Sequence, residues 1–144
     1  MKIVELYSDG SCISNPGPGG WACILKCTME NGEYEKEFYG SEDNTTNNRM
    51  ELTGVIVGLQ QLKYKCKVII TTDSQYVVNA FNKGWIYNWE KQKFAGRPNS
   101  DLWEKLLALV KQHEVEFVWI RGHAGHAYNE RCDKLANYSA RKLI

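Results

Sequence analysis

The chain has 144 residues and a formal net charge of +1, so it is long enough for one domain with its own core, and any basic surface has to be local. No apolar run approaches the ~18 residues of a membrane span, and the N-terminus lacks the apolar region of a signal peptide. The five cysteines are odd in number and include no C-x-x-C pair, which favours a reduced, cytoplasmic chain without a zinc site.

Three strands are predicted at the start of the chain, over residues 3–9, 21–28 and 33–40. The turn-forming stretch 15–20, NPGPGG, separates the first two strands. The pair Asn31-Gly32 is a strong hairpin signal between the second and the third. We therefore expect an antiparallel meander.

Helices and strands alternate in the rest of the chain. Apolar residues recur at steps of three and four from Leu52 to Leu62, which predicts an amphipathic helix. The stretch 85–98 lacks clear periodicity and predicts a surface excursion. The remaining predicted elements are a strand at 68–72, helices at 75–83 and 102–110, a strand at 115–120 and a helix from 129 to the end.

This order of elements predicts an α/β fold. A strand followed by a helix and another strand favours parallel pairing through a right-handed crossover. We expect a five-stranded mixed sheet, with the antiparallel meander at one edge and helices on both faces.

Four acids recur at the edges of the predicted elements. Asp9 and Asp73 lie at the carboxyl ends of predicted strands, whereas Glu51 and Asp133 lie in first turns of helices. Ligand sites in open α/β sheets form outside the carboxyl ends of parallel strands, so the four carboxylates can converge there. Close carboxylates repel one another and raise their pKa values, a cost that Mg²⁺ or Mn²⁺ removes. Two such ions about 4 Å apart suit in-line phosphodiester chemistry.

Each acid also has an ordinary structural explanation. Asp9 precedes a glycine, which is typical of a turn. Asn48 and Glu51 have the spacing of a capping box, with Asn48 as the N-cap. Asp73 could be a plain N-cap, and the helix dipole favours an acid in the first turn at Asp133. Taken singly, the residues leave both interpretations open.

Longer motifs run through the chain in a fixed order. They are YSDGSC at 7–12, NPGPGG at 15–20, TTNNRMEL at 45–52, TDSQY at 72–76, DLW at 101–103, GHAGH at 122–126 and NERCD at 129–133. In these motifs, over nearly the whole chain, the sequence resembles ribonuclease H of the type 1, bacterial kind. The resemblance implies a single ribonuclease H domain over 1–144, acting as a monomer. The resemblance also implies that the protein is an endoribonuclease, which hydrolyses the RNA strand of RNA–DNA hybrids and leaves 5′-phosphate and 3′-hydroxyl ends.

The resemblance also implies roles for individual residues. The four acids would bind two Mg²⁺ ions, with Mn²⁺ as a possible substitute and Asp9 bridging both. The ion shared with Asp133 would hold the attacking water, and the ion held by Glu51 and Asp73 would stabilise the leaving 3′ oxygen. His123 matches the family's functional histidine, which moves protons or helps the product leave. An unperturbed imidazole titrates near pH ~6.5, which suits such shuttling.

The other two histidines are given structural roles. His126 is expected to be paired within its loop, and His113 is expected at the surface, at the end of a helix. No cysteine or acid completes a usual zinc spacing around His123 and His126.

Substrate recognition is expected to use polar groups at the RNA minor groove, where 2′-hydroxyls distinguish RNA from DNA. The residues that match the family's recognition groups are Cys12, Asn15, Asn47, Asn48 and Gln75. Thr46, at a helix N-terminus, matches the family's pocket for a DNA-strand phosphate. Alternatively, these residues form turns and caps.

The family's basic protrusion matches residues 83–98. Its Trp85, Lys91, Lys93 and Arg97 place cations among aromatic rings, a combination that suits a nucleic-acid strand. The alternative is a small hydrophobic subcore with solvated lysines, to which Trp89 would belong. The segment is shorter and less lysine-rich than the family's longer bacterial pattern, which bears on hybrid binding but not on the chemistry.

Three other functions fit the sequence less well. A non-catalytic binding module of this fold would lack one or more of the four acids. A DNA-cutting resolvase or transposase domain leaves the TTNNRMEL and GHAGH motifs unexplained. A domain of a reverse transcriptase fits poorly with a Met two residues before the first strand. The sequence leaves open whether Cys12 and Cys132, both close to the acids, form a redox-sensitive pair.

Overall fold

The computed structural model of the chain describes residues 1–122 and 125–144. The strands are β1 (Lys2–Cys12), β2 (Gly17–Met29), β3 (Gly32–Thr45), β4 (Cys66–Thr72) and β5 (Glu114–Trp119). The helices are α1 (Asn47–Gln60), α2 (Gln75–Asn82), α3 (Trp85–Lys91), α4 (Ser100–Val110) and α5 (Ala127–Arg141). None of these helices is long and apolar enough to cross a membrane.

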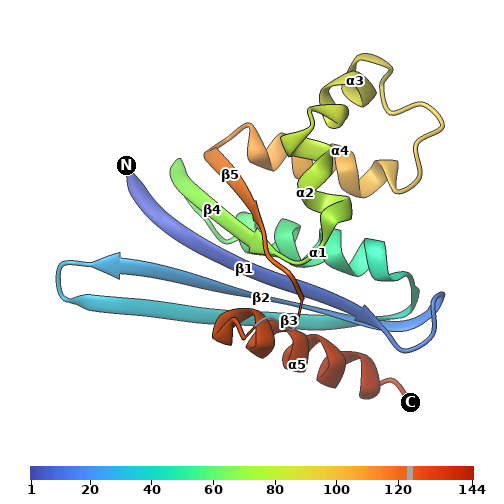
Figure 1. The fold of residues 1–144 in the computed structure, drawn as a ribbon, viewed down its shortest axis with the longest axis horizontal. Helices are drawn as coiled ribbons and strands as arrows, with labels where there is room; N and C mark the ends of the chain where they lie inside the picture. The colour runs from blue at the N-terminus through green and yellow to red at the C-terminus, as the bar shows by residue number, and fades with distance from the viewer. Residues whose placement is uncertain (123–124) are drawn as a thin grey trace.

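The strands form one five-stranded sheet in the order β3-β2-β1-β4-β5. The three N-terminal strands pair antiparallel, whereas β4 lies parallel to both β1 and β5. The predicted mixed sheet with a meander at one edge is therefore confirmed (Figure 1).

Helices cover both faces of the sheet because β2 buries side chains on both. Cys23 packs into the larger core with residues of α1, α2 and α4, such as Leu52 and Trp103. Ala22 and Ile24 point to the opposite face and pack with Cys132 and Ala136 of α5. In Figure 1, α5 accordingly lies on the other side of the sheet from α1, α2 and α4.

The opening strands are longer than predicted. The chain turns between β1 and β2 at residues 13–16, so the glycines of the predicted 15–20 turn already belong to β2. The expected β2–β3 hairpin is present, with Met29 paired to Gly32 and a positive φ of 132° at that glycine. Pairing along the meander therefore extends strand structure into stretches that have the composition of turns.

The segment 85–98, predicted as a surface excursion without clear periodicity, begins with a short helix that the sequence analysis did not predict. Gly84, with a left-handed φ of 73°, begins the helix α3, which is only seven residues long. Two turns are too short to show a helical repeat in the sequence. Ile86 and Phe94 are buried in the main core, which confirms a hydrophobic component in this segment.

The prediction of a surface position for His113 is also wrong. Its side chain is buried, and its Nδ1 accepts a hydrogen bond of 3.0 Å from the backbone N–H of Cys66, the first residue of β4. Burial lowers the pKa of His113. His113 therefore joins the α4–β5 connection to the start of the neighbouring parallel strand as a neutral acceptor.

Candidate active site

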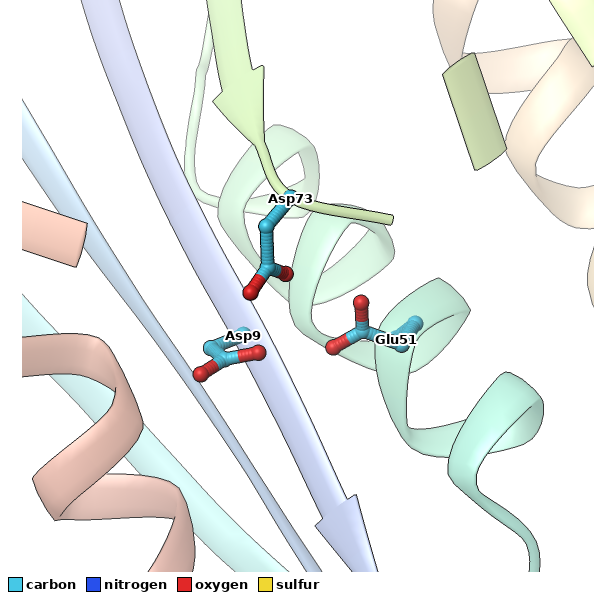
Figure 2. Close-up of side chains that lie close together, drawn as sticks. All are labelled: Asp9, Glu51 and Asp73. Carbon is cyan, nitrogen blue, oxygen red and sulfur yellow. The ribbon is translucent and has the colours of Figure 1, made fainter. Parts of the chain in front are cut away.

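Three carboxylates meet at one place on the sheet. Asp9 lies on β1, Glu51 on α1 and Asp73 directly after β4, and one oxygen of each lies within 4.8 Å of the other two (Figure 2). Asp9 is 5% exposed and Glu51 9% exposed. The predicted convergence is confirmed for these three acids.

Asp9 does not end a strand, as the sequence suggested, but lies within β1, opposite Ala22 of β2. The parallel pairing of β1 with β4 stops at Tyr7 and Thr71, whereas β1 continues along β2 to Cys12. The end of β4 therefore lies beside the middle of β1, which places Asp73 next to Asp9.

Glu51 reaches the other two acids because α1 passes very close to β1. A Cβ on Gly10 would lie only 2.4 Å from the backbone nitrogen of Glu51, so glycine is required at this crossing. The N-cap of α1 is Thr46, whose side chain accepts the N–H of Arg49 at 3.2 Å. The capping-box explanation for Asn48 and Glu51 is therefore wrong.

The simple structural explanations also fail for Asp73 and Asp133. Ser74, not Asp73, is the N-cap of α2 and accepts the N–H of Val77 at 3.3 Å. Asp133 is the seventh residue of α5 and thus lies beyond the first turn, because the helix begins at Ala127.

Asp133 faces the three-acid cluster from α5. It lines a small cavity of about 20 Å³ together with Asp9 and Asp73. Its Oδ1 accepts a hydrogen bond of 3.1 Å from Nδ2 of Asn137, whose Oδ1 accepts the hydroxyl of Ser11 at 2.8 Å. Asn137 therefore ties Asp133 to β1, a contact that the sequence analysis did not anticipate, although the i, i+4 spacing places the two side chains on one helix face.

The electrostatics of the cluster oppose full ionisation. Burial, followed by the charge of Glu51, raises the pKa of Asp9 far above its usual range. Burial also raises the pKa of Glu51, and the charge of Asp73 adds to that effect. Close, desolvated carboxylates have raised pKa values unless a countercharge is present.

The cavity beside the acids also contains residues that the sequence analysis missed. Arg121, Asn129 and Glu130 line it, and the buried Oδ1 of Asn129 has no hydrogen-bond partner among the described residues. The signal was present in the NERCD motif, because Asn129 precedes Asp133 by one helical turn. His126, for which we expected a partner within its loop, is exposed and lines this cavity. His123 lies outside the described residues.

The predicted substrate-binding residues near β1 contact one another. The N–H of Cys12 donates to Oδ1 of Asn47 at 2.7 Å, and the N–H of Asn47 donates to Oδ1 of Asn15 at 3.1 Å. These bonds connect the end of β1, the β1–β2 turn and the start of α1. Cys12 and Cys132 are both free thiols.

Two neighbouring grooves lead from the acids to the segment 83–98. The first, about 390 Å³, is lined by the four acids together with Asn47, Asn48 and Gln75. The second, about 430 Å³, shares Asn48, Gln75 and Tyr76 with the first and adds Asn79, Trp85, Trp89, Arg97, Pro98 and Asn99. The structure therefore places Trp85 and Arg97 along a path that begins at the acids.

The side chains of the second groove differ in their packing. Trp89 packs edge-on against the buried Trp103, with ring centroids 5.3 Å apart, as expected of a subcore residue. The guanidinium of Arg97 lies 4.1 Å from the Trp89 ring centroid. Lys91 and Lys93 are exposed and do not line either groove.

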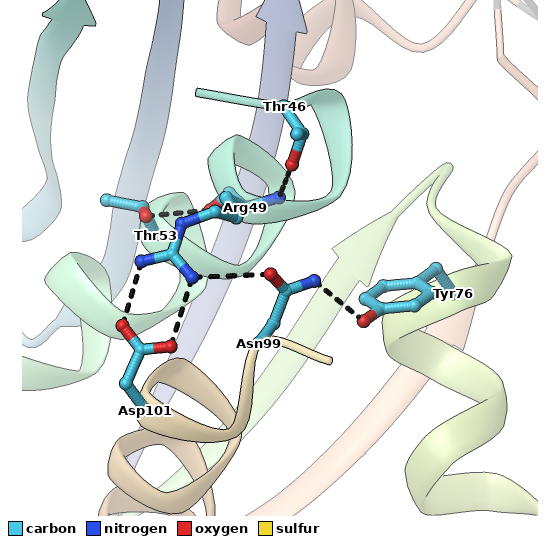
Figure 3. Close-up of polar contacts among 6 residues, drawn as sticks. All are labelled: Thr46, Arg49, Thr53, Tyr76, Asn99 and Asp101. Atoms are coloured by element: carbon cyan, nitrogen blue, oxygen red, sulfur yellow. Dashed lines mark hydrogen bonds and ion pairs between the residues drawn. The ribbon is translucent and has the colours of Figure 1, made fainter. Parts of the chain in front are cut away.

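A polar network that the sequence analysis did not foresee connects helices around these grooves. Arg49 of α1 forms a two-pronged ion pair with Asp101 of α4, at 3.0 and 2.8 Å (Figure 3). Arg49 also donates to Oδ1 of Asn99 at 3.2 Å, and Nδ2 of Asn99 donates to the Tyr76 hydroxyl at 3.0 Å. The network joins the starts of α1, α2 and α4, which carry or flank the groove residues.

Comparison with known proteins agrees with this geometry. The sequence profile of the RNase H family matches residues 1–141. The chain belongs to the RNase H family. It is thus related to hydrolytic nucleases, in agreement with the resemblance of its motifs to type 1 ribonuclease H.

Individual relatives support the assignment to RNase H. The chain is 53% identical to ribonuclease HI of Neisseria meningitidis, over 96% of each chain. It is 51% identical to ribonuclease H of Syntrophotalea carbinolica, over 94% of this chain and 89% of that protein.

Among solved structures, the chain is similar to LC9-RNase H1, which is described as a type 1 RNase H with the type 2 active-site motif. The two superimpose with a TM-score of 0.90 at 32% sequence identity, over 100% of this chain and 74% of that one. LC11-RNase H1 in complex with RNA/DNA hybrid shares the fold, with a TM-score of 0.75 at 22% identity over 96% and 97% of the two chains.

Proposed function

We propose that this protein hydrolyses the RNA strand of RNA–DNA hybrids by a two-metal-ion mechanism, leaving 5′-phosphate and 3′-hydroxyl ends. The observation that carries the proposal is the cluster of Asp9, Glu51 and Asp73, faced by Asp133, in a chain of the RNase H family. A structural role explains the cluster poorly, because burial and mutual repulsion make it costly without a cation.

The residues of the cluster fit divalent metal ions. Carboxylate oxygens are the hard donors that Mg²⁺ and Mn²⁺ prefer. The buried Oε1 of Glu51 has no hydrogen-bond partner among the described residues, so it is free to accept a cation. Asp9, Glu51, Asp73 and Asp133 would hold two Mg²⁺ ions, with Mn²⁺ as a substitute. When bound, such ions supply charge stabilisation at the reacting phosphate and a more acidic water.

The protein's own residues would then orient the cluster and move protons. Asn137 holds the Asp133 carboxylate against β1 through Ser11, which fixes the direction from which that acid reaches the site. We assign proton transfer or product release to His123, on the resemblance of its motif alone.

The grooves supply a path for the hybrid. Asn47, Asn48 and Gln75 line the groove at the acids, where they would meet the minor groove of the substrate. Cys12 and Asn15 act beside them through the Asn47 contacts. LC11-RNase H1, which shares the fold, has been solved with an RNA/DNA hybrid, so the fold can accommodate such a duplex.

The segment 83–98 would hold the DNA strand. Trp85 and Arg97 line the second groove, and Lys91 and Lys93 add exposed positive charge nearby. Thr46 would help to bind a phosphate at the N-terminus of α1. We further propose that residues 1–144 are one domain that acts as a monomer in the cytoplasm, in keeping with five free cysteines.

A cleavage assay tests the proposal. Labelled RNA–DNA, RNA–RNA and DNA–DNA duplexes are incubated with the protein, with Mg²⁺ or with excess chelator. We expect cleavage of the RNA strand in the hybrid alone, and only with the ion. The 3′ fragments should be joined by a ligase without prior phosphorylation, because they carry 5′-phosphates. Cleavage of a DNA strand, or undiminished cleavage in chelator, would contradict the proposal.

A further inference from the structure

The end of β5 makes a set of contacts with the short connection that carries Asp73. Asp73 lies between the last residue of β4 and the N-cap of α2, and thus outside regular secondary structure. The backbone N–H of Ile120 donates to the carbonyl of Thr72 at 3.1 Å. The indole N–H of Trp119 donates to the backbone carbonyl of Asp73 at 3.0 Å. The backbone carbonyls of Thr72 and Asp73 therefore each accept a hydrogen bond from the end of β5 or the residue that follows it.

The side of Asp73 that faces the chain beyond β5 is also closely fitted. A Cβ on Gly122 would lie 2.8 Å from Oδ2 of Asp73. Thr72 adds a local contact, because its hydroxyl accepts the N–H of Ser74 at 3.2 Å. The backbone before and after Asp73 is therefore fixed by Ile120 and Thr72, while Trp119 fixes the carbonyl of Asp73 itself.

The bond from Trp119 contributes little to stability but defines an orientation. The contact is exposed, and Trp119 is 42% exposed. Water can replace an exposed donor at a small net cost, because hydrogen bonds to water and to protein are similar in free energy. Water does not fix the plane of the Asp73 peptide, however, and a carboxylate attached to a mobile peptide binds a cation less well.

The geometry points to Trp119 as a positioning residue for Asp73, one that tunes the affinity of the acidic cluster for divalent ions through its indole N–H. This inference rests on the proposed function, in which Asp73 is a metal ligand. Partners that orient a ligand from outside the coordination sphere typically change metal affinity by 10–100-fold when they are removed. A single exposed bond to a carbonyl belongs at the lower end of that range.

The test compares the wild-type protein with three variants in the absence of nucleic acid. Trp119→Phe removes the N–H and keeps an aromatic ring. Val115→Ala is the matched control, because Val115 lies on β5, packs partly buried against the core and has no described contact with Asp73. Asp73→Asn reports whether the cluster binds the ion at all. Mn²⁺ affinity is measured by calorimetric titration, and thermal unfolding is measured in chelator.

We expect Trp119→Phe to raise the Kd for Mn²⁺ by about tenfold with little change in Tm. Val115→Ala should lower Tm and leave the Kd unchanged. In a ¹H–¹⁵N spectrum of the metal-free protein, the amides of Asp73 and Ser74 should shift in Trp119→Phe but not in Val115→Ala.

The outcomes separate the two proposals. An unchanged Kd in Trp119→Phe, beside a clear loss in Asp73→Asn, would overturn the role of Trp119 alone. Equal Mn²⁺ affinity in the wild type and in Asp73→Asn would overturn the role of Asp73 as a metal ligand, and the role of Trp119 with it.

Discussion

At Asp9 a carboxylate is buried next to Glu51 and Asp73, with a pKa raised by burial and by its neighbours. The free energy of folding therefore includes a penalty for holding negative charges together in a site with little water. Acids in such an arrangement are suited to a cation rather than to stabilising the protein.

The first prediction at this scale concerns Asp73→Asn. The amide keeps the shape of the side chain but gives up its charge, so we expect the folded structure to persist and RNA cleavage in Mg²⁺ to fall below about a tenth of wild-type turnover. The Tm of the metal-free variant should rise, because one of three repelling carboxylates is gone. Turnover and thermal unfolding in chelator measure both effects. A variant that retains more than a tenth of the activity would show that Asp73 is not a required ligand.

Among single residues, the acids were predictable and their surroundings were not. Convergence of Asp9, Glu51 and Asp73 follows from element order and from the rule that sites form where parallel strands end. The role of Gly10 depends on the distance between α1 and β1, which no local pattern encodes. Asn137 likewise joins Asp133 to β1 through Ser11, which is 126 positions away in the sequence.

At the scale of elements, tertiary contacts override local composition. Residues 10–12 continue β1 because β2 pairs with them, although their composition favours a turn. The helix α3 forms over seven residues that show no period, with Ile86 buried in the core. Long periodic elements such as α1 were predictable because the apolar residues of their buried face recur at a helical spacing in the sequence.

His113 provides a prediction for the junction of α4, β5 and β4. Burial lowers its pKa below the 6.5 of an unfolded histidine. The unfolded state therefore binds more protons between the two pKa values, and stability falls as the pH decreases through that window. Protonation at Nδ1 would also remove the acceptor for the Cys66 N–H.

We expect His113→Asn, which keeps an acceptor but does not titrate, to lose less Tm than the wild type between pH 7.5 and 5.5. At pH 7.5 the variant should be less stable by on the order of 1 kcal/mol, because the buried ring is lost. Thermal unfolding at closely spaced pH values, in chelator, measures the difference in slope. The acidic cluster and the other histidines are common to both proteins and cancel. Parallel curves would show that folding does not lower the pKa of His113.

At the scale of the whole molecule, the net charge is only +1, but the positive and negative side chains are unevenly distributed around the grooves. Arg97 lines the second groove and Lys91 and Lys93 are exposed in the same segment, while the acids line the first groove. A duplex that spans both grooves would bring its backbone to these cations and its scissile phosphate to the acids. Binding through phosphates in this way depends on the salt concentration.

The last prediction compares two triple variants of equal charge. Replacement of Lys91, Lys93 and Arg97 by Ala should weaken hybrid binding and flatten the plot of log K against log salt by about 0.9 for each phosphate that the protein no longer neutralises. Replacement of Lys63, Lys65 and Lys67 by Ala is the control. These residues lie before or at the start of β4, at the opposite end of that strand from Asp73.

Hybrid Kd is measured at several salt concentrations with Ca²⁺ or chelator in place of Mg²⁺, together with Tm. The control should keep the wild-type slope, because its charges are far from the grooves. Turnover of the first variant at saturating substrate should survive, since none of its three positions belongs to the acidic cluster. If the segment 83–98 serves only as a folded subcore with idle surface charge, both variants will bind alike. An unchanged slope in the first variant would then mean that the protein binds its substrate through other residues. The segment 83–98 would in that case serve the core, to which it contributes the buried side chains of Ile86 and Phe94.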